Sequence, residues 1–203
     1  MCGRYYIDDD TAREIEKLVR QIDEKRKQKS VPCKVEITAK DIHPTETAPI
    51  LTSFGSGLEC RWQKWGFPGF QKGQVIFNAR CESALEKSMF REAILHHRAV
   101  IPAAGFYEWD RRKQKHTFYR EGSGLLLMAG CYRKYEDGDR FVILTTQANA
   151  SMEPVHDRMP LILERDEAVD WLLEDSGSMV QELLRKSPPM LERRTEYEQM
   201  SLF

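Results

Sequence analysis

The middle of the chain is a succession of short strand-like segments separated by turns, and this pattern constrains the fold most strongly. The segments are rich in β-branched and aromatic residues and are bounded by Gly, Asp and charged turns, as antiparallel strands are. They cover residues 48–54, 58–64, 75–77, 98–109, 116–120, 125–134, 141–146 and 161–163. The pattern predicts a β-rich core, either barrel-like or made of twisted antiparallel sheets.

Helices are predicted towards both ends of the chain. Apolar residues recur at helical spacing within residues 11–29, and Asp8 to Asp10 can supply N-cap oxygens to this helix. Residues 167–173 and 179–184 fit further amphipathic helices, whereas residues 41–45 read as a loop because Pro44 disfavours helix before it. We therefore expect a single α+β domain over residues 1–203, with helices flanking the β-rich core. The tail 188–203 has no predicted place.

Composition limits the class of protein. The chain has 203 residues, 41% of them hydrophobic, and a net charge of -1, so a nucleic-acid partner would need a local basic patch. No stretch is long and apolar enough to span a membrane. The five cysteines are odd in number and contain no C-x-x-C pair, which favours free thiols in a reducing compartment over disulfides or a zinc site. We expect a cytoplasmic monomer without a membrane partner.

The chain begins Met1-Cys2-Gly3-Arg4, and Cys2 is the first candidate for chemistry. Cysteine is small enough for the initiator methionine to be removed before it, which would leave an α-amine and a thiol on adjacent carbons. The pKa of an unperturbed α-amine is about 7.7–8.0 and that of a cysteine thiol about 8.5. Such an aminothiol condenses with an aldehyde to an imine and then closes to a thiazolidine.

Three further islands of polar residues stand where a core or turn explanation is incomplete. They are Asn78-Ala79-Arg80-Cys81-Glu82-Ser83, Gly105-Phe106-Tyr107-Glu108-Trp109 and Val155-His156-Asp157-Arg158-Met159-Pro160. Each alone has a structural explanation. Asn78 can cap a helix and Glu82 can pair with Arg80. Glu108 can point to solvent as a strand residue, and His156 can be an ordinary loop histidine.

Together the four islands, in this order, resemble the SOS-response-associated peptidase family, whose members are now described as abasic-site processing proteins. The resemblance also includes Trp65-Gly66-Phe67 and Pro44, and it extends from Met1 to about Glu174. The family's activity is covalent capture of abasic sites in single-stranded DNA through a thiazolidine on the N-terminal cysteine. For this chain the resemblance implies the family's fold, single-stranded DNA with an abasic site as the partner, and no cofactor.

The resemblance also implies roles for individual residues. The catalytic set falls on Cys2, Asn78, Glu108 and His156. The expected DNA contacts are Arg4, Pro44, Trp65, Phe70, Arg80, Glu82, Ser83, Arg158, Met159 and Pro160. A carboxyl held among aromatic residues, as Glu108 is, suits proton transfer because its ionised form is disfavoured. Exposed aromatic residues would stack flanking bases, with Trp65, Phe67 and Phe70 as candidates.

The chain departs from the family pattern in three places. The loop 65–74 is short, Ile42-His43 precedes Pro44 where many members have Asn-x-x-Pro, and the tail lacks the usual valine-asparagine strand motif.

Two other functions stay open at this point. An N-terminal-nucleophile hydrolase would use the Cys2 thiol on an amide, with its α-amine as base. A non-covalent single-strand binding protein would leave Cys2 without a role. Metal catalysis is not expected, because His96 and His97 are adjacent and cannot share one helical face.

Overall fold

The computed structural model describes residues 2–26, 38–55, 57–122 and 124–196. Five strands form a closed barrel, because β12 pairs with β4 on one side and with β11 on the other. Around the barrel the strands are β4 (Gly57–Trp65), β3 (Thr47–Phe54), β8 (Arg98–Ala103), β11 (Leu126–Tyr135) and β12 (Gly138–Gln147). Only the β12–β4 closure is parallel. The predicted β-rich, barrel-like α+β fold is confirmed.

Short strands extend the barrel where the site lies. Next to β12 lie β7 (Asn78–Arg80), which runs parallel to it, and β13 (Arg158–Pro160), which runs antiparallel. β14 (Ile162–Leu163) pairs with β11, and β5 (Phe67–Pro68) pairs with β6 (Val75–Ile76). The segments 78–83 and 155–160, which were predicted to carry chemistry, thus each contribute a strand that pairs with β12.

A second, five-stranded antiparallel sheet lies beside one end of the barrel. Its order is β15 (Glu192–Thr195), β10 (Lys115–Tyr119), β9 (Gly105–Trp109), β1 (Tyr5–Ile7) and β2 (Lys40–Ile42). This sheet corrects three predictions. The single strand expected over 98–109 is β8 and β9 in different sheets, part of the expected loop 41–45 belongs to β2, and the unplaced tail contributes β15.

The division between β8 and β9 has a local cause. The backbone N–H of Ala104 donates to the carbonyl of Tyr6, which carries the chain from the barrel to the second sheet. At Gly105 a Cβ would lie only 2.5 Å from the carbonyl oxygen of Phe118, so this close crossing requires glycine.

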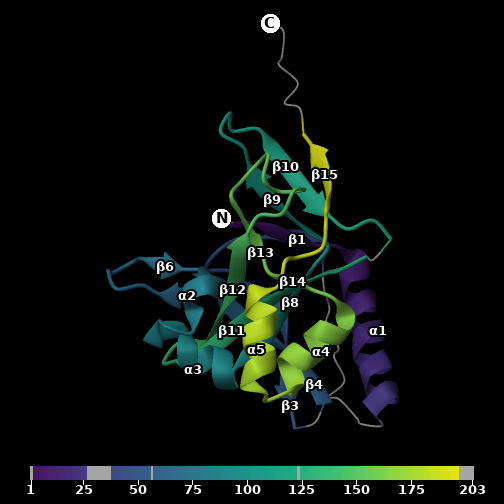
Figure 1. Cartoon of the computed structure of the whole chain (residues 1–203), viewed down its shortest axis with the longest axis vertical. Helices are drawn as coiled ribbons and strands as arrows, with labels where there is room; N and C mark the ends of the chain where they lie inside the picture. Colours follow the sequence, from purple (N-terminus) through teal and green to yellow (C-terminus); the bar gives the residue numbers. More distant parts are fainter. Residues whose placement is uncertain (1, 27–37, 56, 123, 197–203) are drawn as a thin grey trace, which may run out of the picture.

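Helices cover the outside of the barrel (Figure 1), and the described parts of the chain contain five of them. They are α1 (Asp9–Arg26), α2 (Cys81–Ala84), α3 (Ser88–His96), α4 (Arg165–Leu173) and α5 (Gly177–Arg185). The carboxylate of Asp8 accepts the N–H of Thr11 at 2.9 Å, which confirms the predicted cap of α1. The last residues predicted for this helix, 27–29, lie outside the described residues.

Two hydrophobic clusters divide the interior. One packs the helices against the outer surface of the barrel. The other fills the barrel and the space beneath the second sheet, and it contains Cys2, Tyr5, Trp65, Phe106 and Phe141. None of the helices in the described ranges combines the length and apolar character that crossing a membrane requires.

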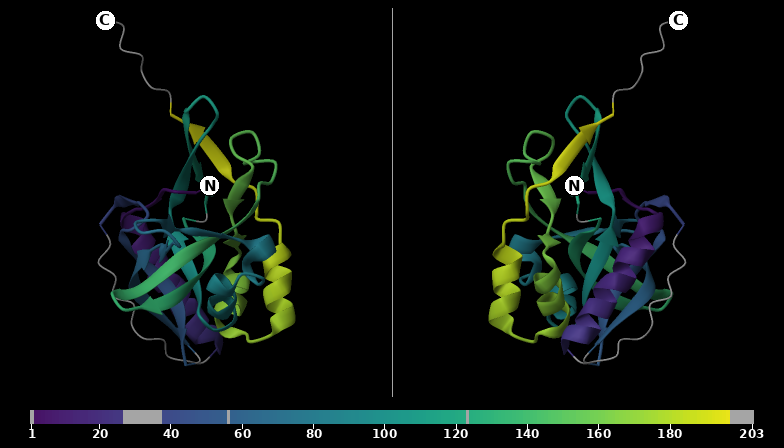
Figure 2. Two further views of the ribbon diagram at one scale, coloured as in Figure 1. Left: turned by 90° about the vertical axis from the view of Figure 1, so that its left-hand side faces the viewer. Right: turned by 90° about the vertical axis from the view of Figure 1, so that its right-hand side faces the viewer.

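Two parts of the chain project from the same end of the molecule (Figure 2). One is the hairpin β9–β10 with β15 beside it, and the other is the loop 149–157 that follows β12.

Candidate functional site

Cys2 is held inside the protein by the first residue of β7. Its side chain is fully buried, and its carbonyl accepts a hydrogen bond from Nδ2 of Asn78 at 2.8 Å. Asn78 is fixed by the parallel pairing of β7 with β12, where it lies opposite Ile143. Oδ1 of Asn78 is buried and has no hydrogen-bond partner among the described residues. The amide therefore holds the Cys2 backbone through Nδ2 and can accept a hydrogen bond through Oδ1.

Glu108 lies on the buried face of β9. It is 5% exposed, whereas Tyr107 is partly exposed and Trp109 is 37% exposed, as strand alternation requires. Burial raises the pKa of the Cys2 thiol, and the nearby charge of Glu108 raises it further. The two groups therefore lie within electrostatic range of each other.

His156 ends the projecting loop 149–157 and forms part of a groove of about 820 Å³. The opposite wall is Trp109 to Arg112, the segment that follows Glu108. Nδ1 of His156 lies 2.9 Å from the backbone N of Arg158 and 2.9 Å from Oδ1 of Asp157. The backbone N–H of Arg158 donates to Nδ1, so the ring orientation is fixed by the segment that follows it.

Arg158, expected to contact phosphate, is instead occupied by groups of the protein. Its Nη1 and Nη2 donate to the two carboxylate oxygens of Glu82 at 2.6 and 3.0 Å, and Nη2 donates to the carbonyl of Thr145 at 2.6 Å. The Arg158 side chain is 11% exposed and that of Glu82 is 48% exposed. The suggested pairing of Glu82 with Arg80 is replaced by this pair with Arg158.

Arg4 is also paired. Its guanidinium donates to Oδ2 of Asp41, with Nε at 2.9 Å, while the hydroxyl of Tyr107 donates to Oδ1 of the same carboxylate at 3.0 Å. Burial, followed by the hydrogen bond to Asp41, raises the pKa of Tyr107, so it stays a phenol. Both arginines therefore reach a phosphate only in competition with a carboxylate.

Three of the predicted DNA contacts have buried side chains. Trp65 is fully buried, donates from Nε1 to the carbonyl of Phe77 at 2.9 Å and packs parallel to Phe141. Met159 and Pro160 are buried in β13. Phe67, another proposed stacking residue, is also fully buried.

The other predicted contacts keep accessible surface. Phe70 is 89% exposed and Arg80 is exposed, while Pro44 and Ser83 are partly buried. Among the aromatic candidates, only Phe70 is open enough to stack on a base.

Two buried polar residues near the site were missed from the sequence. The hydroxyl of Tyr5 is buried without a hydrogen-bond partner among the described residues, and burial followed by the charge of Cys2 raises its pKa. His116 is 6% exposed and lies opposite Glu108 in the β9–β10 pair. The alternation of residues around Phe118 could have placed His116 on the inner face of its strand. The place of Tyr5 depends on the pairing of β1 with β9, which is a feature of the tertiary structure.

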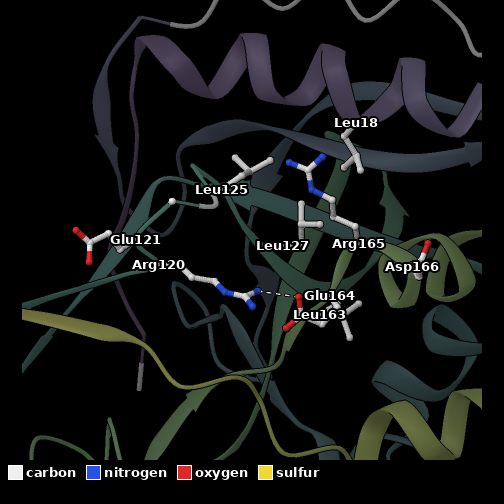
Figure 3. Close-up of a pocket in the computed structure, with 10 residues that line it drawn as sticks. Leu18, Arg120, Glu121, Leu125, Leu127, Leu163, Glu164, Arg165 and Asp166 are labelled. Carbon is white, nitrogen blue, oxygen red and sulfur yellow. Dashed lines mark hydrogen bonds and ion pairs between the residues drawn. The ribbon is translucent and has the colours of Figure 1, made fainter.

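A second cavity, of about 600 Å³, lies between α1 and the start of α4 (Figure 3). Arg120 and Glu164 form a hydrogen bond of 2.8 Å in it, and its other walls are mainly leucine and charged residues. None of the predicted site residues lines it. No group of three or more His, Cys, Asp or Glu side chains in the described parts of the chain is placed to hold a metal ion.

The fold and the site define an α+β barrel protein with a buried cysteine at position 2 that is hydrogen-bonded by an amide and lies within the electrostatic influence of a carboxyl. The fold is shared with solved structures. A phage-related protein from Bordetella bronchiseptica matches with a TM-score of 0.78 and 19% identity over 97% of this chain and 95% of that one. A protein from Bacteroides thetaiotaomicron matches with a TM-score of 0.75 and 22% identity over 96% of this chain and 91% of that one.

Sequence comparison identifies the family. The model of the SOS response associated peptidase (SRAP) family matches residues 1–200, and the chain belongs to that family. It is 32% identical to the abasic site processing protein YoaM of Bacillus subtilis, over 65% of this chain and 64% of that protein. It is 36% identical to YoqW of Bacillus subtilis, over 65% and 68%, and 33% identical to YedK of Escherichia coli, over 59% and 58%. Both bear the same description, and the matched regions thus span about two-thirds of these relatives or less.

Proposed function

We propose that the protein processes abasic sites in single-stranded DNA by forming a covalent crosslink through Cys2. The observation that carries the proposal is the placement of Cys2, whose carbonyl is held by Asn78 and whose thiol lies within the field of Glu108. The names of the relatives supply the substrate class. The protein would act in the cytoplasm as a monomer.

The reaction needs only an aminothiol and an aldehyde. After removal of Met1, the neutral α-amine of Cys2 attacks C1′ of the ring-opened deoxyribose and forms a carbinolamine. Loss of water gives an imine, and the thiol sulfur then adds to the same carbon while its proton passes to the nitrogen. The products are a thiazolidine and one water molecule, and no oxidant or cofactor is required.

The neighbouring residues have matching roles. Glu108 delivers the proton that expels water and later recovers it, which makes the crosslink reversible in principle. Asn78 orients the Cys2 backbone and keeps Oδ1 for the amine or the sugar. His156, from the groove wall, serves the sugar hydroxyl freed on ring opening. Diversion of the imine to β-elimination gives weak strand cleavage as a side reaction.

The family description also names a peptidase, so amide hydrolysis is the second candidate. A cysteine peptidase attacks with a thiolate, but burial and Glu108 raise the pKa of the Cys2 thiol and keep it protonated at neutral pH. Imine formation begins at the amine and does not require the thiolate. The environment of Cys2 therefore favours aldehyde capture over amide hydrolysis.

The test is incubation with a single-stranded oligonucleotide carrying one abasic site, followed by a denaturing gel. Wild-type protein should give a stable adduct, and Cys2→Ala should give none. A form with an uncleaved N-terminal extension should bind the oligonucleotide but form no thiazolidine. Absence of an adduct with wild-type protein of verified N-terminus would refute the proposal, and turnover of an amide substrate would support the peptidase.

A further inference from the structure

His116 lies beside Glu108 although the sequence did not mark it as a site residue. The two residues are direct partners across β9 and β10, and they are 6% and 5% exposed. Directly opposite residues of an antiparallel pair point to the same face, with Cβ atoms about 4.5–5.5 Å apart. The imidazole of His116 and the carboxyl of Glu108 therefore lie side by side on the same buried face of the sheet.

The two nitrogens of the His116 ring have different surroundings. Nδ1 lies 3.0 Å from Oγ1 of Thr195 in β15. Nε2 is buried without a hydrogen-bond partner among the described residues, and Oδ2 of Asp110, just after β9, lies 3.5 Å from it. The ring is thus held from the C-terminal strand through Nδ1, and supporting contacts of this kind fix the orientation of groups at a reaction centre.

The simpler explanation is that His116 only fastens β15 to β10. Thr117, the next residue, offers a comparison because it is 2% exposed and its Oγ1 lies 3.4 Å from Oε1 of Glu196. It also connects β10 with the end of the chain, but it lies on the opposite face and away from Glu108. A fastening role is shared by both residues, whereas contact with the site face belongs to His116.

We propose that His116 is a positioning residue for Glu108, and that β15 holds it in place through Thr195. The C-terminal strand is then part of the support of the reaction centre. This inference rests on the proposed function, because Glu108 is taken to transfer protons at the Cys2 adduct.

The test separates chemistry from binding in single-turnover crosslinking of an abasic oligonucleotide. His116→Phe keeps the ring volume and removes both nitrogens, and the rate constant at saturating DNA should fall about ten- to a hundredfold, as for a displaced catalytic group. The half-saturating DNA concentration should change less than about twofold, because no DNA contact is removed. Thr195→Val, which keeps the size of the side chain and frees the ring, should lower the rate in the same way by a smaller factor. It serves as the second variant if His116→Phe folds poorly.

Thr117→Val is the matched control and should leave both quantities within about twofold of wild type. Equal losses in Thr117→Val and Thr195→Val, or wild-type rates in His116→Phe, would overturn the proposal. Each variant is also treated with glycolaldehyde, and the thiazolidine on Cys2 is measured by intact mass. If wild-type protein captures glycolaldehyde but not abasic DNA, the proposed function alone is refuted. A slower capture of glycolaldehyde by His116→Phe would then still support the positioning role. Capture of neither would overturn both.

Discussion

Removal of the negative charge of Glu82 should strengthen the binding of undamaged single-stranded DNA. The guanidinium of Arg158 is fixed from behind by the carbonyl of Thr145 at 2.6 Å, and Glu82 covers its outer side with two hydrogen bonds. Glu82 is the more exposed partner, with 48% of its side chain accessible against 11% for Arg158. A phosphate that approaches this side meets a carboxylate first.

The size of the effect follows from one charge. The hydrogen bond from Arg158 lowers the pKa of Glu82 below its ordinary value, so the carboxylate is charged throughout the neutral range. In Glu82→Gln one more phosphate can be neutralised, and the slope of log K against log salt should steepen by about 0.7 for a single strand. At low salt the affinity should rise about two- to fivefold, as expected for a partly exposed ion pair.

Fluorescence anisotropy of a labelled, undamaged oligonucleotide over about 50–200 mM salt measures both quantities. Glu86→Gln is the matched control, because Glu86 is exposed on the same short segment and its replacement changes the net charge equally. Indistinguishable affinities and slopes for the two variants would refute the reasoning, since a general charge effect would then suffice.

Three further predictions concern stability. Arg98, 7% exposed, donates to carbonyls near the ends of α3 and α4, among them Leu95 at 2.8 Å and Glu174 at 2.6 Å, so Arg98→Met should cost about 3 kcal/mol or more in urea unfolding. Arg91→Met on the exposed side of α3 should cost almost nothing. The lowered pKa of Glu82 means that its pair with Arg158 stabilises the fold above the ordinary value near 4.5, and that this stabilisation is lost as pH falls through the lowered folded value. Wild type should therefore have a higher Tm than Glu82→Gln at pH 7, and this difference should shrink towards zero as the pH is lowered. A difference in Tm that does not change with pH would contradict this. At Gly66, where φ is +113° and a Cβ would lie 2.3 Å from Cγ1 of Val75, Gly66→Ala should destabilise by about 1–3 kcal/mol.

Local patterns predicted much of the fold. The hairpin around Gly55, the cap at Asp8 and the helices near both ends were predicted because each depends on neighbours within a few residues. The division of residues 98–109 was not predicted, because a continuous apolar strand pattern does not show that the chain leaves one sheet for another at Ala104.

The placement of β15 was not predicted either. Its sequence, Glu192-Arg193-Arg194-Thr195, has no apolar alternation and is stabilised by pairing with β10.

The candidate site divides in the same way. The sequence by itself determined which residue types are available: a cysteine at position 2, an amide, a carboxyl among aromatics and a loop imidazole. Tertiary structure decided which of these side chains are accessible, since Trp65 is buried and carboxylates from distant segments pair with Arg4 and Arg158. It also decided that Glu108 lies on the buried face of β9, opposite His116. The physical reason is that chemical identity belongs to single residues, whereas burial and charge pairing depend on segments far apart in the chain.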